Sequence, residues 1–204
     1  MSGEFLDKAF GLDTSEDASQ FYNHWASTYD AEIGENGYAI QGRCAKALFA
    51  KLPEPEAPVL DFGCGTGLSG LALKRAGFKV VDGIDPSPDM LAQARAKGVY
   101  RNLSSLDVTD KTPIPKGTCK AIATIGVIGP GAAPVPTFDI LMKALDRGGY
   151  LVFSYNDHAL ADPIYDGALN GWLDCGAARL LSKDYGPHLP GQGLNSNVYV
   201  LQKA

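Results

Sequence analysis

The sequence predicts an α/β protein built on a Rossmann-like, doubly wound sheet of seven strands, mostly parallel, with an antiparallel C-terminal hairpin. Three observations predict this fold. Short apolar runs alternate with helical patterns from residue 59 to residue 173, which is typical of βαβ units. A glycine-rich turn at residues 63–67 follows the first run directly. The last two runs, residues 177–181 and 197–201, have no helical pattern between them, so we expect them to pair as a hairpin at the sheet edge.

Hydrophobic periodicity and helix-ending residues define the individual elements. Before the sheet, a helix is expected over residues 15–33, and a second helix begins near Ile40 and ends before Pro53. Ser87 is suited to an N-cap, Pro88 to the first helical position and Gly98 to the end of that helix. The strands before the hairpin are expected within residues 59–62, 79–85, 99–108, 119–128 and 150–154, and the other helices at residues 68–76, 138–145 and 162–173.

Length and charge limit the class of protein. A chain of 204 residues suits one α/β domain with a short appendage, and 45% hydrophobic residues allow a sizeable core. The formal net charge is −5 and no cluster of Lys and Arg is present. Proteins that bind the nucleic-acid backbone neutralise phosphates with such clusters. The expected partner is therefore a small-molecule substrate and no nucleic acid, with the protein a monomer or a homodimer.

The cysteines and the apolar stretches predict where the protein works. The four cysteines lie far apart without a Cys-x-x-Cys pair, so neither a metal site nor a disulfide framework is expected. The first eight residues have no apolar h-region of a secretory signal. The longest uncharged stretch, residues 121–138, contains three prolines and cannot form a regular membrane helix. We expect a cytoplasmic protein that binds no metal and no membrane.

The turn at residues 63–67 predicts a site for a nucleoside cofactor. Alternate glycines after a strand allow a tight turn and let a ligand approach the bare backbone. Asp85 ends the next strand, where a carboxylate accepts hydrogen bonds from both hydroxyls of a ribose. The dinucleotide fingerprint Gly-x-Gly-x-x-Gly is not met, because Leu68 occupies the third glycine position, and Asp61 would repel a pyrophosphate. A ligand with an ammonium group and no phosphate, such as S-adenosylmethionine, fits the pattern better.

Several motifs resemble one family. Residues 60–67 (LDFGCGTG) and 83–91 (GIDPSPDML) resemble the first two motifs of class I S-adenosylmethionine-dependent methyltransferases. Residues 146–152 (DRGGYLV) resemble the glycine turn that precedes the fifth strand of that family. The pattern of Tyr, Trp and Tyr-Asp in residues 22–30, and residues 185–191 (YGPHLPG), are most similar to the methyltransferase-like branch named for the Williams–Beuren syndrome region. The resemblance covers roughly residues 20–204 and implies S-adenosylmethionine as the cofactor.

The resemblance also implies which residues contact the cofactor. The glycine turn would line the methionine end, and Asp85 would hold the ribose. The third strand would flank the adenine, with Asp107 accepting from the exocyclic amine, and the end of the fourth strand would lie under the sulfonium. Together with Asp61, the implied residues are Gly63, Cys64, Gly65, Gly67, Asp85, Pro86, Met90, Leu106, Asp107, Val108, Ile125 and Gly126.

An aromatic stripe precedes the sheet. Tyr22, Trp25 and Tyr29 recur at helical spacing and share one face of the first helix. An aromatic face near a sulfonium gains a cation–π attraction of about 0.5–2 kcal/mol, so all three residues are interpreted as cofactor contacts. The alternative is that the stripe only packs this helix onto the core. We expect residues 1–40 to form a helical lid over an S-adenosylmethionine-binding methyltransferase domain of residues 41–204.

Two histidines are candidates for a general base. His188 lies in residues 185–191, expected as a loop, and His158 follows the fifth strand; an imidazole titrates near neutrality. Hydrogen bonding within a loop is the alternative role for both, and His188 is the catalytic candidate. Residues 126–134 lack the Asn/Asp-Pro-Pro-Tyr/Phe motif of enzymes that methylate exocyclic amines. The sequence therefore predicts methyl transfer to an unidentified small-molecule acceptor; the alternative is a non-catalytic S-adenosylmethionine-binding sensor or partner protein.

Overall fold

The computed structural model describes residues 15–204, with side chains from residue 21 onward. The strands are β1 (Val59–Phe62), β2 (Val81–Asp85), β3 (Leu103–Ser105), β4 (Ala121–Thr124), β5 (Tyr150–Asn156), β6 (Ala178–Leu189) and β7 (Leu194–Lys203). The helices are α2 (Ser15–Glu35), α3 (Ile40–Lys51), α4 (Leu68–Ala76), α5 (Pro88–Lys97), α6 (Pro136–Ala144), α7 (Asp157–Leu160) and α8 (Pro163–Asp174), with one 3-10 turn at Pro190–Gln192.

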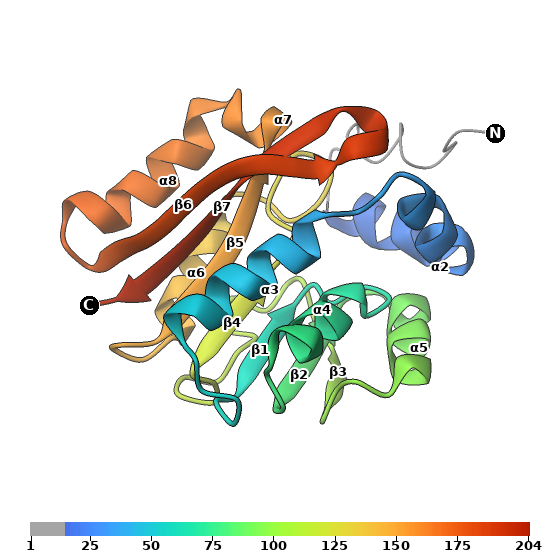
Figure 1. Cartoon of the computed structure of the whole chain (residues 1–204), viewed down its shortest axis with the longest axis horizontal. Helices are drawn as coiled ribbons and strands as arrows, with labels where there is room; N and C mark the ends of the chain where they lie inside the picture. Colours follow the sequence, from blue (N-terminus) through green and yellow to red (C-terminus); the bar gives the residue numbers. More distant parts are fainter. Residues whose placement is uncertain (1–14) are drawn as a thin grey trace.

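The strands form one seven-stranded sheet in the order β3-β2-β1-β4-β5-β7-β6. Strands β1 to β5 pair in parallel, whereas β7 pairs antiparallel with both β5 and β6. Helices α3 and α4 cover one face of the sheet, and α6 and α8 cover the other (Figure 1). The predicted fold class, including the antiparallel C-terminal hairpin at the sheet edge, is therefore confirmed.

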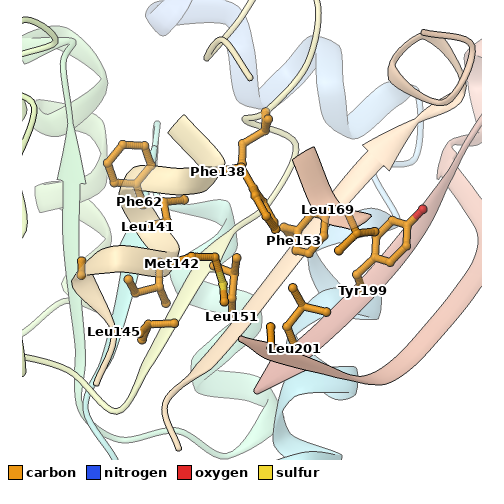
Figure 2. Close-up of a cluster of buried hydrophobic side chains, with 14 of the residues drawn as sticks. Phe62, Phe138, Leu141, Met142, Leu145, Leu151, Phe153, Leu169, Tyr199 and Leu201 are labelled. Carbon is orange, nitrogen blue, oxygen red and sulfur yellow. The ribbon is translucent and has the colours of Figure 1, made fainter. Parts of the chain in front are cut away.

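Two hydrophobic cores lie on the two faces of the sheet, because successive side chains of a strand point to opposite faces. On β5, Leu151 and Phe153 pack toward α6 and α8, whereas Val152 packs toward α3 and α4. Figure 2 shows the first of these cores, in which Phe153 and Tyr199 lie beside residues of α6 and α8. The two rings stack with centroids 4.8 Å apart. The two cores pack against the central strands from both faces, and the strands end at the carboxyl edge of the sheet.

The helix signals in the sequence act as expected at α5. The Ser87 hydroxyl accepts a hydrogen bond from the Met90 N–H at 3.1 Å, and Pro88 occupies the first helical position. Gly98 ends the helix with a left-handed φ of 63°. These signals fix where α5 begins, directly after Asp85 and Pro86. The residues that follow β2 are thereby held at the carboxyl edge.

Helix α2 lies across this edge, beside α5 and the β6–β7 turn (Figure 1). Its Trp25 is 1% exposed and packs in a separate cluster with Ile33, Leu189 and Leu194. The aromatic stripe thus does pack the helix onto the sheet hairpin, as the structural interpretation of the stripe expects. It also faces the cavity described below, so the two interpretations are not exclusive.

Residues 185–191 differ from the expected loop. Strand β6 continues to Leu189, pairing Pro187 with Asn195 of β7 before the 3-10 turn begins. A proline is tolerated here because β6 is the edge strand, where its missing N–H faces no partner strand. In contrast, β4 stops at Thr124 and not near residue 128, and Gly126 takes a positive φ of 70° beyond it. The short helix α7 has no counterpart in the sequence prediction.

We predict that Phe153→Ala lowers the free energy of unfolding by about 3–5 kcal/mol, because it empties a fully buried aromatic position. Urea unfolding followed by circular dichroism measures this loss. The matched control is Ile164→Ala on α8, where the side chain is 56% exposed and the change should stay within about 0.5 kcal/mol. Equal losses in both variants would show that the core in Figure 2 is packed otherwise.

Candidate functional site

The glycine turn lies between the ends of β1 and β2. Gly63, Gly65 and Gly67 all have positive φ, a conformation that other residues adopt only with strain. A Cβ on Gly63 would come within 2.6 Å of a methyl carbon of Val127. The N–H groups of Gly63 and Cys64 both donate to the Ile84 carbonyl, at 2.9 and 3.1 Å. The turn is thus fixed against β2 and presents bare backbone to the space in front of it.

Asp85 closes that space from the β2 side. Its side chain is buried, and one carboxylate oxygen accepts from the Gly65 N–H at 2.8 Å while the other accepts from the Ser87 N–H at 2.9 Å. Burial raises the pKa of Asp85 to about 6, and the two backbone hydrogen bonds oppose that rise. Each oxygen keeps a second lone pair with which it can accept a ligand hydroxyl.

A cavity of about 380 Å³ opens in front of the turn, in the size range of small-molecule sites. Its walls come from α2, the β1 turn, the end of β2, the segment after β3 and the segment after β4. Most of the predicted cofactor contacts meet there. The predicted residues that line the cavity are Tyr22, Tyr29, Gly63, Gly65, Asp85, Pro86, Met90, Leu106, Asp107, Val108, Ile125 and Gly126.

The remaining predicted contacts do not line this cavity. Asp61 lies behind the turn, fully buried, and accepts hydrogen bonds from the Ser69 hydroxyl at 2.6 Å and the Tyr100 hydroxyl at 2.7 Å. Its other oxygen has no hydrogen-bond partner among the described residues. Cys64 and Gly67 also face away from the cavity: the Cys64 sulfur lies near Gly83 of β2, and a Cβ on Gly67 would meet Ala94 of α5. Trp25 lines the neighbouring chamber only.

Several wall residues were not predicted. Tyr38 lines the cavity from the link between α2 and α3, where no periodic pattern marks it. Lys111 and Thr137 lie outside the strands and helices that were expected from the sequence, in segments to which no role was assigned. Val127 comes from the end of the strand expected at residues 119–128, but β4 stops at Thr124 and Val127 lies in the irregular segment that follows. Its glycines and prolines were the available signal, since such a segment after a strand follows a defined path at a sheet edge.

A smaller chamber of about 60 Å³ adjoins the cavity. The two share wall residues of α2, Tyr38 and the segment that begins at Gly126. The chamber adds Trp25, Ser154, Asn156 and His188 to its walls. His188, the predicted catalytic residue, is 6% exposed, and desolvation lowers its pKa to about 4. The second histidine candidate, His158, is exposed on α7 and lines neither space.

Helix α2 is tied to the glycine turn by polar contacts. Asp30 accepts a hydrogen bond from the Thr66 hydroxyl and pairs with the Lys97 ammonium at 2.7 Å. Lys97 also donates to the Thr66 carbonyl at 2.6 Å, which joins α2, the turn and α5. Asn23 and the Ser87 hydroxyl form a further hydrogen bond between α2 and the start of α5. The helix that covers the cavity is therefore coupled to the turn that forms its floor.

Within residues 15–204, no helix is both long and apolar enough to cross a membrane. The same part of the chain contains no group of three His, Cys, Asp or Glu side chains arranged as metal ligands. The expected cytoplasmic location stays a prediction.

A Rossmann-like sheet with a cavity at its carboxyl edge is the arrangement found in proteins that bind nucleoside cofactors. The fold and the site place this protein in that structural class.

Residues 59–149 match the family model described as a methyltransferase domain. The chain is 35% identical over 129 residues to methyltransferase-like protein 27 of Homo sapiens, covering 62% of this chain and 53% of that protein. It is 29% identical over 133 residues to the 18S rRNA (guanine(1575)-N(7))-methyltransferase of Saccharomyces cerevisiae, covering 58% and 48%. The chain thus spans about half the length of these relatives.

A solved structure agrees at the level of the fold. The S-adenosylmethionine-dependent methyltransferase of Geobacter sulfurreducens, crystallised with S-adenosyl-L-homocysteine, superposes with a TM-score of 0.56 at 16% identity, covering 79% of this chain and 91% of that one. Residues 59–149 therefore resemble a methyltransferase domain, and the fold of the chain is that of S-adenosylmethionine-dependent methyltransferases. The predicted resemblance is confirmed for residues 59–149 and for the fold, and the names of the similar proteins agree with the predicted enzyme class and cofactor.

The prediction that the partner is a small-molecule substrate and no nucleic acid is wrong. A matched relative is named for methylating a guanine of 18S rRNA. The net charge of −5 describes the average surface of the chain. An enzyme that takes one base into a cavity reads that base by stacking and hydrogen bonds, so its chemistry does not require a basic surface. Net charge therefore cannot exclude a nucleic-acid acceptor.

We predict that the buried Asp61 carboxyl makes the protein less stable as the pH rises. Burial raises its pKa to about 6 in the folded protein from an ordinary value of 3.8, so the folded state holds the proton longer than the unfolded chain. The folded protein has the full stabilisation from the neutral Asp61 carboxyl below pH 4, and this stabilisation is lost as the pH rises through 6. One pKa unit corresponds to about 1.4 kcal/mol.

Urea unfolding of Asp61→Asn and the wild type between pH 4 and 8 measures this effect. The variant should gain stability relative to the wild type over that range. Asp82→Asn is the matched control with the opposite sign, because Arg101 lowers the pKa of Asp82 and the native ion pair stabilises the fold above pH 4. Parallel curves for Asp61→Asn and the wild type would contradict the assignment.

Proposed function

We propose that the protein transfers a methyl group from S-adenosylmethionine to an acceptor that enters beside Gly126. The observation that carries this proposal is the buried Asp85 carboxylate, which lies in the cavity wall and is hydrogen-bonded to the glycine turn. Each of its oxygens accepts one backbone N–H and keeps a lone pair for a further donor. This arrangement fits the two hydroxyls of a ribose.

The other wall residues fit the remaining parts of the cofactor. The bare backbone of Gly63 and Gly65 would hold the methionine part, where a side chain would block the approach. Pro86 and Met90 would pack against the adenine. One Asp107 oxygen accepts from the Thr109 N–H and hydroxyl, so the other stays available to the exocyclic amine. These assignments follow the family motif residue by residue.

The chain itself positions the reactants and excludes water. When bound, S-adenosylmethionine supplies a methyl carbon that its sulfonium already activates. The protein must align that carbon with the acceptor, which reduces the entropic part of the barrier. Tyr22 and Tyr29 of α2 form part of the cavity wall, where they would limit the access of water to a bound cofactor. This geometry supports α2 as the described part of a lid over a methyltransferase domain of residues 41–204, whereas residues 1–14 of the predicted lid (residues 1–40) lie outside the described residues.

The alternative is a sensor or partner protein that binds the cofactor without transferring its methyl group. Such a protein has no use for an open space beside the expected sulfonium position. In this chain the chamber of about 60 Å³ adjoins Gly126 and is not filled by side chains. This open chamber supports methyl transfer over the sensor role.

We predict that Asp85→Ala weakens binding of S-adenosylhomocysteine at least tenfold, because it removes both acceptors for the ribose and frees the glycine turn. Isothermal titration calorimetry with S-adenosylmethionine, S-adenosylhomocysteine and NAD measures this; the first two should bind the wild type and NAD should not. Asp82→Ala on the same strand is the control, since Asp82 does not line the cavity. Unchanged affinity in Asp85→Ala would disprove the ribose assignment.

A lid predicts a second effect. Asp30→Ala removes the contacts of α2 with Thr66 and Lys97, so cofactor affinity should fall about three- to tenfold while the core stays folded. The control is Thr28→Ala on the same helix, which removes only an exposed hydrogen bond to Glu32. Calorimetric titration with S-adenosylhomocysteine compares the two variants. If deletion of residues 1–35 and Asp30→Ala both leave the affinity unchanged, α2 is no lid.

A further inference from the structure

The chamber beside Gly126 has features of a binding site in its own right. It shares wall residues with the cofactor cavity and is lined by aromatic side chains from α2 and the α2–α3 link, including Trp25 and Tyr38. Its volume of about 60 Å³ admits the reacting end of an acceptor, while the remainder must lie outside. An acceptor of any total size can therefore use it, provided that one small group enters.

His188 is a polar side chain in the chamber wall. It extends from β6 near the sheet edge, and its Nδ1 is buried with no hydrogen-bond partner among the described residues. A histidine that served only to tie β6 to its neighbours would satisfy a buried nitrogen, because an unpaired one costs about 1–3 kcal/mol. The unpaired Nδ1 is therefore an acceptor that a donor group of a ligand could satisfy once the ligand enters the chamber.

Tyr38 and His188 flank the same stretch of backbone. Their rings meet edge to face with centroids 5.5 Å apart. A Cβ on Gly126 would lie 2.5 Å from the Tyr38 hydroxyl and 3.7 Å from His188 Cε1. Gly126 is also the residue that the family motif sets under the sulfonium. The chamber therefore brings an imidazole next to the expected position of the methyl group.

The charges around the chamber determine which acceptor it favours. None of its described wall residues is Lys, Arg, Asp or Glu. Arg43 and Asp157 lie behind His188, and Arg43 is engaged by Asp184 and by the Pro187 carbonyl. Desolvation and Arg43 keep the imidazole neutral, with a pKa of about 4. A carboxylate or phosphate would enter this space without a cation to pair with, at a high desolvation cost.

We propose that the chamber receives a neutral ring N–H or O–H of the acceptor and that neutral His188 is the base that takes its proton. The proposal rests on the methyl transfer inferred above. The acceptor's lone pair forms the new bond to the methyl carbon, and the carbon–sulfur bond breaks with its electron pair left on sulfur. The acceptor proton passes to His188 Nδ1 and afterwards to water. The ring belongs either to a free molecule or to an exposed nucleic-acid base.

Binding of matched probes to the protein saturated with S-adenosylhomocysteine tests the charge preference. Phenol should bind at least tenfold more tightly than benzoate or phenyl phosphate, which carry the same ring with a negative charge. Methylation of phenol, of free guanosine and of a short guanosine-containing RNA strand then separates the sources of the ring. If the charged probes bind as well as phenol, or if no neutral probe binds or is methylated, the proposal is overturned.

Substitution of His188 tests the base. In His188→Gln and His188→Asn, affinity for S-adenosylhomocysteine should stay within about twofold of the wild type. The wild-type rate should be nearly flat from pH 6 to 8, whereas the variants should be slower and gain about tenfold per pH unit, since the acceptor must then ionise unaided. His158→Gln on exposed α7 is the control. If the methylation rate of both His188 variants does not change with pH, the proposal is overturned. If the wild type does not bind S-adenosylhomocysteine, the proposed function itself is refuted.

Discussion

The hydrogen bond from the Gly65 N–H to the Asp85 carboxylate is the contact on which the site depends. It joins two parallel strands at the point where both end, and the Ile84 carbonyl holds the same turn from below. Because Asp85 is buried, its charge is tolerated only with such donors, and the turn provides one only when its glycines adopt positive φ. The glycines and the carboxylate therefore require each other, and together they fix the floor of the cavity.

The same turn also holds the covering helix. Thr66 follows Gly65 directly and contacts both Asp30 of α2 and Lys97 of α5. A ligand that orders the turn would therefore stabilise the contacts of α2 with it, and these contacts would in return favour the ordered turn. This reciprocity needs no long pathway, because a single residue connects the two. The aromatic stripe has both roles, because Trp25 packs α2 onto the hairpin while Tyr22 and Tyr29 line the cavity.

Local patterns predicted most of the fold and the part of the site that follows the backbone. The alternation of strands and helices, the Ser87 cap and the glycine turn are local signals, so the sheet, α5 and the position of Asp85 were predicted correctly. The direction of Asp61 depends on the pleat of β1, which turns it with Val59 toward the α3–α4 face; the period of two was an available but unused signal. Tyr38 could not be predicted, because it lies in a short link without periodicity.

The net charge of the whole chain does not determine which acceptor the protein uses. The net charge of −5 sets the average field, which salt screens beyond a Debye length of about 8–10 Å. Recognition inside the chamber depends instead on the few groups within contact distance, and these are uncharged aromatic, aliphatic, hydroxyl and amide side chains with His188. The surface charge therefore bears on how quickly an acceptor arrives, whereas the chamber decides which group reacts. An acidic protein with a neutral chamber can therefore accept the ring of a free molecule or the ring of an exposed nucleic-acid base.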